Sequence, residues 1–314
     1  MSIKLSSLVA RNIKLYFKDK LTFFVSLITP LILVILFLTF LGKIYETSLT
    51  SMMPEGITLD AKLIKGFTGG WLFSSILATS CITVSFCSNM MVYDKLNRAT
   101  QDFLISPVKQ STLQLSYTIS NFITTFLVCF VAFVVGLIYL AIVGWYLSFV
   151  DILLIIVNMV ICISFGSLLA SFAGLFMNSQ GALSAVSTMV SSMYGFLCGA
   201  YMPLSQMSKG IVGFVSFIPG TYSTVLFRQY YMNGVLKQVA TKLPPESAEA
   251  ITQNIRAGFD GSFEFFGNAV PTWAMYVITI GAVFVMLGIY LLAAYLKNKK
   301  GYRPLPQKPK KAKA

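Results

Sequence analysis

The sequence contains no histidine and little charge: 11% of its 314 residues are charged, and 11 acidic side chains face 24 basic ones. A soluble domain of this length needs far more charged surface, and 56% of the residues are hydrophobic. The apolar residues form long blocks, and about 20 such residues suffice for a helix to cross a bilayer. The chain is therefore predicted to be an integral membrane protein.

Ionisable side chains are missing from the interior of every predicted membrane span. Ion- and proton-coupled carriers need such groups at membrane depth, so a secondary transporter is not expected. The spans offer neither histidine nor paired carboxylates for an intramembrane hydrolase, and the chain lacks the GxxxxGK[ST] phosphate loop. We therefore predict no enzyme and no cofactor, nucleotide or metal bound by this chain, so that active transport would take its energy from a partner.

The cysteines are predicted to be small packing residues. All of them lie in apolar runs, with no CxxC pair and no histidine to complete a metal site. A buried free cysteine behaves as a small apolar side chain, so a disulfide framework is not expected. The five are Cys81, Cys87, Cys129, Cys162 and Cys198.

The net charge is +13, and the basic residues lie just outside the apolar spans. Basic residues at these positions orient a membrane protein and contact anionic lipid headgroups. Membrane lipid is thus an expected partner and nucleic acid is not. An even number of spans puts both termini on one side, and that side carries more basic residues once the long outer segment is given less weight. We expect a multi-pass protein of a bacterial cell membrane with both termini in the cytoplasm.

The order of apolar and polar stretches predicts an all-α polytopic fold. Residues 1–20 form an amphipathic interfacial helix, 21–296 a transmembrane domain with six helices, and 297–314 a basic, disordered cytoplasmic tail. The predicted spans are 21–42, 69–92, 113–143, 149–177, 181–202 and 273–296.

The outer segment, 203–271, breaks the regular pattern because prolines interrupt moderately apolar stretches. Its stretch Gly210–Ile218 is too short to span and predicts a re-entrant or interfacial hairpin. Residues 223–268 are predicted to form polar helical pieces outside the membrane.

A polar island, residues 94–110, separates the second and third spans and is predicted to be a cytoplasmic coupling segment. It combines charges with an apolar knob at 103–105, which suits the groove of a partner protein. The alternative is that the knob only dips into the membrane interface. The candidate coupling residues are Asp94, Arg98, Thr100, Asp102, Phe103, Leu104, Ile105, Ser106 and Pro107.

Three patterns carry a family resemblance: the island from Arg98 to Val108, the stretch Gly166–Ser171 with the turn at 178–180, and the run from Gly199 to Arg228. With the order of the parts, they resemble the membrane subunits of ABC exporters of the ABC-2 type, whose fold includes the membrane half of ABCG transporters. The similarity singles out a second cytoplasmic turn and a broken outer segment. These comprise Asn178, Ser179 and Gln180, and then Pro203, Pro219, Tyr222 and Arg228.

The resemblance implies a complex in which this chain pairs with a second permease subunit, either identical or homologous. Two ATP-binding cassette subunits would bind the pair and hold ATP and Mg. Closure of the cassettes would then move the helices through the coupling segments.

The spans are rich in Phe, Met, Leu and small polar residues, so a lateral apolar path for an amphiphile such as a drug, lipid or peptide is predicted. Ordinary helix packing is the alternative for each residue of that path. Two other functions remain open, a scaffold or sensor that moves nothing and a facilitative channel. The candidate path residues, expected at the interface between two subunits, are Phe86, Met90, Met193, Tyr194 and Phe196.

Overall fold

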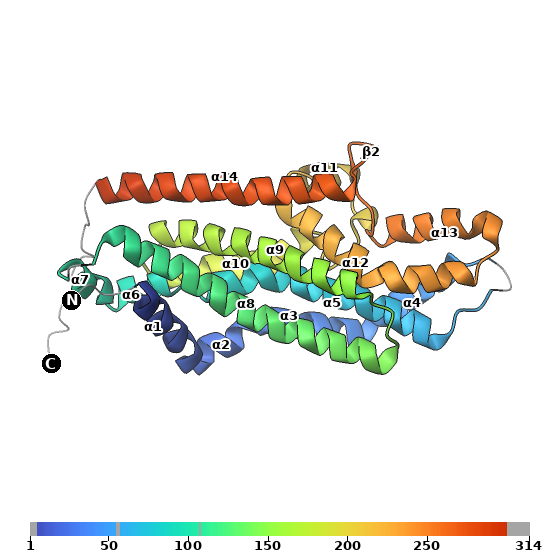
Figure 1. Ribbon diagram of the computed structural model, residues 1–314, viewed down its shortest axis with the longest axis horizontal. Coiled ribbons are helices and arrows are strands. Elements are labelled where there is room, and N and C mark those ends of the chain that lie inside the picture. Colours follow the sequence, from blue (N-terminus) through green and yellow to red (C-terminus); the bar gives the residue numbers. More distant parts are fainter. Residues whose placement is uncertain (1–4, 55–56, 107, 300–314) are drawn as a thin grey trace, which may run out of the picture.

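The computed structural model describes residues 5–54, 57–106 and 108–299, and its long helices run side by side along one axis (Figure 1). The all-α prediction is confirmed, since the only strands described are the two-residue β1 (Glu264–Phe265) and β2 (Asn268–Ala269), paired antiparallel. The helices are α1 Leu5–Lys18, α2 Lys20–Ser26, α3 Ile28–Leu36, α4 Gly42–Ser51, α5 Ala61–Cys87, α6 Met90–Leu96, α7 Ala99–Leu104, α8 Gln110–Val143, α9 Phe149–Phe176, α10 Gln180–Leu197, α11 Lys209–Val215, α12 Pro219–Thr241, α13 Pro245–Gly258 and α14 Thr272–Lys299.

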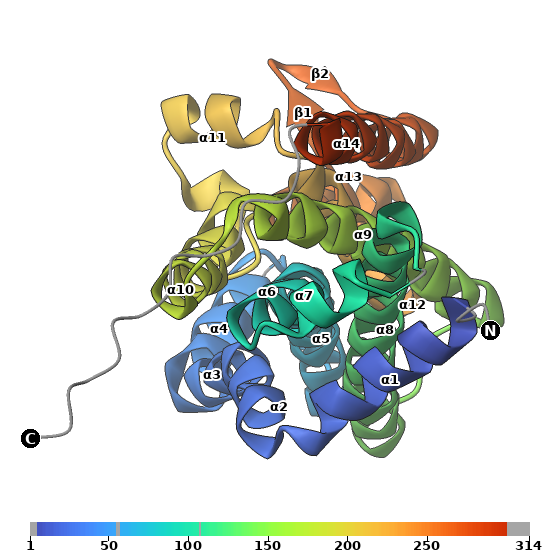
Figure 2. The same ribbon diagram turned by 90° about the vertical axis from the view of Figure 1, so that its left-hand side faces the viewer.

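Helix α5 is the centre of the bundle, and it contacts α3, α8, α9, α10 and α12. Figure 2 shows it in the middle of the molecule, between α9 and α3. Small residues permit these close contacts: a Cβ at Gly166 of α9 would lie 2.7 Å from the carbonyl oxygen of Cys81 in α5. Hydroxyl side chains along α5 donate hydrogen bonds to carbonyl oxygens of the same helix, as Thr79 does to Ser75 at 2.9 Å.

Five described helices are long and apolar enough to cross a membrane, or six if α11 and α12, bent by 98°, form one broken span. A multi-pass membrane protein is therefore supported. Helix α10, which corresponds to the predicted fifth span, is not among the five because Ser, Thr and Gly dilute its apolar residues. The five are Pro30–Ser51, Ala61–Leu96, Gln110–Val143, Phe149–Phe176 and Thr272–Lys299.

The first two long helices extend beyond the predicted spans. After a π-helical turn at Phe37–Leu41 the chain continues as α4 to Ser51, because Tyr45 and Leu49 are buried in the core. Helix α5 already begins at Ala61, with Lys62 exposed in its first turn. It breaks at 88–89, inside the predicted span 69–92.

Helix α12 lies largely within the stretch 223–268, which was predicted to form polar helical pieces outside the membrane, and it is more deeply buried in the chain than its polar composition suggests. It packs along α5, and most of its side chains are buried, polar ones included. The short helix α11 precedes it at a corner, where the Tyr222 hydroxyl donates to the Ser216 carbonyl oxygen at 2.7 Å. Pro219 begins α12, where its missing N–H group costs no helical hydrogen bond.

Helix α1 confirms the predicted amphipathic pattern. Its apolar side, with Leu8, Val9 and Tyr16, is buried, whereas Lys14 and Lys18 are exposed. It lies across the bundle rather than along it (Figure 2). Figure 1 shows it at the same end as α6, α7 and the C-terminal end of α14.

Candidate functional site

The predicted coupling segment forms two short helices, α6 and α7, joined at Arg98, whose φ of 62° is left-handed. A turn at 105–106 then leads toward α8. Arg98, Asp102 and Ile105 are exposed, and Ile105 is 89% exposed although it is apolar. Pro107 lies outside the described residues, and so does the side chain of Leu104.

Asp94 ties this segment to the rest of the bundle. Its buried carboxylate accepts hydrogen bonds from the two terminal nitrogens of Arg11 at 2.7 and 3.0 Å and from the Tyr117 hydroxyl at 2.6 Å. Such a bidentate, charge-assisted contact is both strong and directional. Helices α1, α6 and α8 are thus joined at one carboxylate.

Arg11 has a second role in this cluster, because its guanidinium lies over the ring of Phe103 in α7, 5.1 Å from the ring centre. Its hydrogen bond to Asp94 raises the pKa of Arg11 above its ordinary value, although partial burial opposes this shift. Phe103 is therefore half-buried beneath α1, and only Ile105 is an exposed apolar residue of the described knob. Thr100 and Ser106 are also half-buried.

Two lysines fix the end of α9 beside the coupling segment. The Lys95 ammonium of α6 donates to the carbonyl oxygens of Gly174 at 2.5 Å and Leu175 at 3.1 Å, and Lys297 of α14 also donates to Leu175. The last carbonyls of a helix lack intrahelical partners and carry partial negative charge, so cations stabilise this end. Helices α6, α9 and α14 therefore meet at one point.

The predicted second cytoplasmic turn directly follows α9. Asn178 and Ser179 are exposed, and the Ser179 hydroxyl accepts a hydrogen bond from the backbone N–H of Ala182 at 3.1 Å, which caps α10. The side chain of Gln180 lies outside the described residues. Since Lys95 bonds the end of α9, the structure brings this turn to the same end of the molecule as α6 and α7 (Figure 1).

Arg228 organises a second cluster in the other half of the molecule. It is 0% exposed and pairs with Asp260 at 2.6 Å, donates to the carbonyl oxygen of Gly199, and lies 4.5 Å from the ring centre of Trp71. Asp260 also accepts from the backbone N–H of Leu204 at 2.6 Å. These contacts hold α12 to α5, to the end of α13 and to the chain break after α10.

The four residues predicted for the broken outer segment thus lie at two separate places in the structure. Pro203 is buried just before Leu204, next to the Arg228 cluster, whereas Pro219 and Tyr222 shape the corner between α11 and α12. Sequence reasoning missed Asp260, because Asp260 and Gly261 together are typical of a turn. Asp260 does adopt a left-handed φ of 53°, yet its carboxylate is used inside the core.

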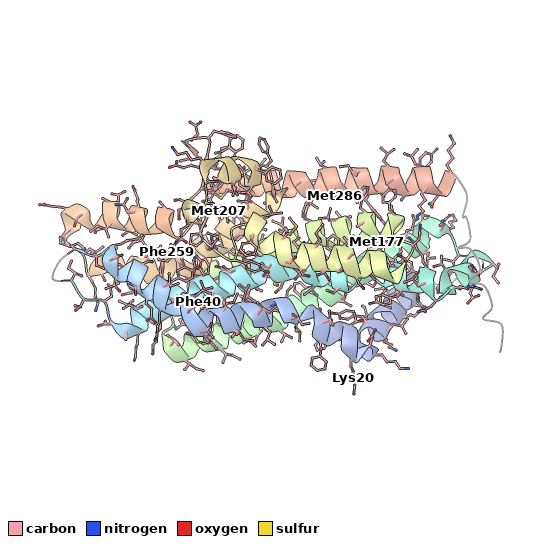
Figure 3. The ribbon with its side chains drawn as sticks, turned by 180° about the vertical axis from the view of Figure 1, so that it is seen from behind. Lys20, Phe40, Met177, Met207, Phe259 and Met286 are labelled. Atoms are coloured by element: carbon pink, nitrogen blue, oxygen red, sulfur yellow. The ribbon has the colours of Figure 1, made fainter. Side chains whose placement is uncertain are left out.

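The candidate path residues do not share one surface. Phe86 and Tyr194 are buried within the subunit and Met90 is half-buried, whereas Met193 and Phe196 of α10 are 49% and 53% exposed. A hollow of about 600 Å³ lies between the end of α10 and α11, and Figure 3 labels Met207 there. Its apolar lining residues are Phe196, Leu197, Met202, Met207, Ile211 and Phe214.

The described part of the chain holds no group of three or more His, Cys, Asp or Glu residues placed to bind a metal. The long helices form a bundle with the short helices α6 and α7 at one end (Figure 1). A family model of the ABC-2 type transporter matches residues 4–232. The chain belongs to the ABC-2 type transporter family. A comparison with curated proteins finds no match.

This ABC-2 type chain is accordingly a transmembrane subunit of an ABC transporter, the permease component of a kind that works with an ATP-binding subunit. The matched region contains α6, α7, the turn after α9 and Arg228. Helices α13 and α14 lie beyond it.

Proposed function

We propose that this subunit belongs to an ATP-driven exporter that moves an amphiphilic or hydrophobic substrate out across a bacterial cell membrane. Two permease subunits, identical or homologous, associate with two cassette subunits that hold ATP and Mg. The observation that carries the proposal is the exposed α7 turn, whose neighbours α1, α8 and α9 are held to the segment by the Asp94 ion pair and the Lys95 contacts.

In the proposed mechanism, a displacement of α7 is transmitted to α1, α6 and α8 together. Phe103 rests beneath Arg11, Arg11 is bonded to Asp94, and Tyr117 of α8 is bonded to the same carboxylate. A charge-assisted network transmits displacement better than exposed loops do, because its members cannot separate without leaving a buried carboxylate unsatisfied. Since α1 and the C-terminal end of α14 lie at the same end of the molecule as α7 (Figure 1), we assign this end and both termini to the cytoplasm.

The substrate path is proposed along the exposed face of α10. Met189, Met193 and Phe196 follow one another at helical spacing on that face and lead into the hollow beside α11. An apolar surface with adaptable Met side chains suits amphiphiles of varied shape. Phe86 and Tyr194 are buried inside the subunit, so we assign them to packing instead.

Ile105→Arg tests the coupling role. We expect at least tenfold weaker association with the cassette subunit that accompanies the wild-type chain, because truncating or charging an apolar anchor at an interface costs about 2 kcal/mol or more. The readouts are the amount of cassette that co-elutes with the tagged chain and the ATP-dependent uptake of substrate into inside-out vesicles, in which the cytoplasmic side faces outward.

Ile142→Arg is the matched control, since Ile142 is also an exposed isoleucine but lies near the far end of α8. It should leave the amount of co-eluting cassette unchanged. Equal cassette binding by the wild-type chain and Ile105→Arg would remove Ile105 from the docking surface and favour the alternative that the knob only touches the membrane interface.

A further inference from the structure

The outward face of α1 carries a shallow hollow of about 480 Å³. Helix α1 packs on α8, and Arg11 at the edge of the hollow bonds Asp94 of α6, whereas Lys14 and Lys18 are exposed. Three of its side chains are cationic, and α1 contains no acidic residue. The lining residues are Ser7, Ala10, Arg11, Lys14, Leu15 and Lys18.

The charge of this hollow is not neutralised within the described part of the chain. Its ion pairs there include Arg11 but neither Lys14 nor Lys18, and both lysines are exposed. The nearest acid in the sequence is Asp19, whose carboxylate accepts hydrogen bonds from the backbone N–H and the hydroxyl of Thr22 and is in none of the ion pairs of the described residues. Two neighbouring ammonium groups one helical turn apart therefore favour an anion.

The hollow lies where charged surface gives way to apolar surface. Lys20 points away from the bundle at the start of α2 (Figure 3). Directly after it Phe24, Val25 and Ile28 are exposed, and the exposed apolar surface continues along α3. In a membrane protein this boundary coincides with the lipid headgroups, where basic residues of an amphipathic helix meet phosphates.

We propose that this hollow is a binding site for the phosphate headgroup of an anionic phospholipid. Lys14 and Lys18 hold the phosphate with charge-assisted hydrogen bonds, and the acyl chains lie along the exposed side chains of α2 and α3. The apolar surface beside the hollow favours a lipid over an acidic protein, which would leave that surface uncovered. Because Arg11 both lines the hollow and bonds Asp94, a bound lipid touches the residue that holds the coupling segment.

The inference does not depend on the proposed function, since it needs only the folded chain in detergent. The delipidated full-length protein is titrated with phosphatidylglycerol or phosphatidylcholine, and native mass spectrometry counts the bound lipids. We expect K14Q/K18Q to bind phosphatidylglycerol roughly twenty-five-fold more weakly, because each basic side chain near an anionic surface contributes about fivefold. Phosphatidylcholine binding should not change.

Two further variants make the result specific. K62Q/K65Q removes the same charge from two exposed lysines at the opposite end of the molecule and should keep wild-type affinity. K14R/K18R keeps the charge and should bind as the wild type does. Each variant is first checked for an unchanged unfolding temperature.

Four outcomes would overturn the site. The first is undiminished phosphatidylglycerol binding by K14Q/K18Q, which would make the lysines a solvated face only. The second is an equal loss in K62Q/K65Q, which would mean nonspecific attraction. The third is displacement of the lipid by millimolar inorganic phosphate, which would assign the hollow to a free anion. The fourth is loss of a co-eluting protein from K14Q/K18Q with lipid binding intact, which would assign the hollow to a protein.

Discussion

Replacing Arg228 by methionine should lower the unfolding temperature of the detergent-solubilised chain by about 10 °C. The guanidinium is fully buried and pairs with Asp260 at 2.6 Å, so its removal leaves a carboxylate without a counter-ion inside the core. Breaking one partner of a buried pair costs about 3–5 kcal/mol, and each kcal/mol corresponds to about 2–4 °C in a chain of this size.

A thiol-reactive fluorophore can follow this unfolding, because Cys81, Cys129, Cys162 and Cys198 are buried and react only when the core opens. Lys242→Met is the matched control: it breaks an ion pair with Asp60 whose side chains are 41% and 65% exposed, and should shift the midpoint by at most about 3 °C. R228M/D260L, which removes both charges, should recover part of the loss. An equal unfolding temperature for R228M and K242M would show that the buried pair has no structural role.

Asp94→Ala should loosen α1 from the coupling segment. The substitution leaves the Arg11 guanidinium and the Tyr117 hydroxyl without their shared acceptor, and Asp94 is buried. A loss of about 2 kcal/mol is expected for such charge-assisted bonds, which corresponds to roughly thirtyfold faster amide hydrogen exchange in α1. Exchange measured by mass spectrometry on peptides from α1 gives the readout.

Asp102→Ala supplies the control, since Asp102 belongs to the same segment and carries the same charge but is exposed. Exchange in α1 should then remain at the wild-type rate, and peptides of α13 should be unaffected in both variants. Similar exchange of α1 in the wild type and in Asp94→Ala would show that Asp94 does not hold this helix.

Hydropathy predicted the positions of α8, α9 and α14 to within three residues at each end, because each of these helices is apolar over most of its length. It did not predict that α12, whose composition is polar, is buried against α5. Some of the polar side chains of α12 find partners inside the bundle, as when the Thr224 hydroxyl donates to the Gly220 carbonyl oxygen or Arg228 pairs with Asp260. Polar composition alone does not distinguish a buried, satisfied helix from an exposed one.

The charges of residues 94–110 and their place between two apolar runs predicted a coupling segment, but they did not predict which residues of the chain this segment contacts. Arg11 and Asp94 are 83 positions apart, and the amphipathic pattern of residues 1–20 does not show that Arg11 bonds a buried carboxylate of another helix. A shift of one position along a helix moves a side chain to another face. Whether that face is buried or exposed depends on the neighbouring helices. For the same reason the exposed Met193 and the buried Tyr194, which are adjacent in sequence, were predicted alike.

The central claim is that a separate ATP-binding subunit drives this permease, and one purification tests it most directly. The tagged chain is extracted gently from native membranes, and co-purifying proteins are quantified and assayed for ATP hydrolysis. We expect a cassette subunit in an amount equal to the permease. A permease that emerges alone from an extraction in which other membrane complexes stay intact would contradict the account and favour a scaffold or a channel.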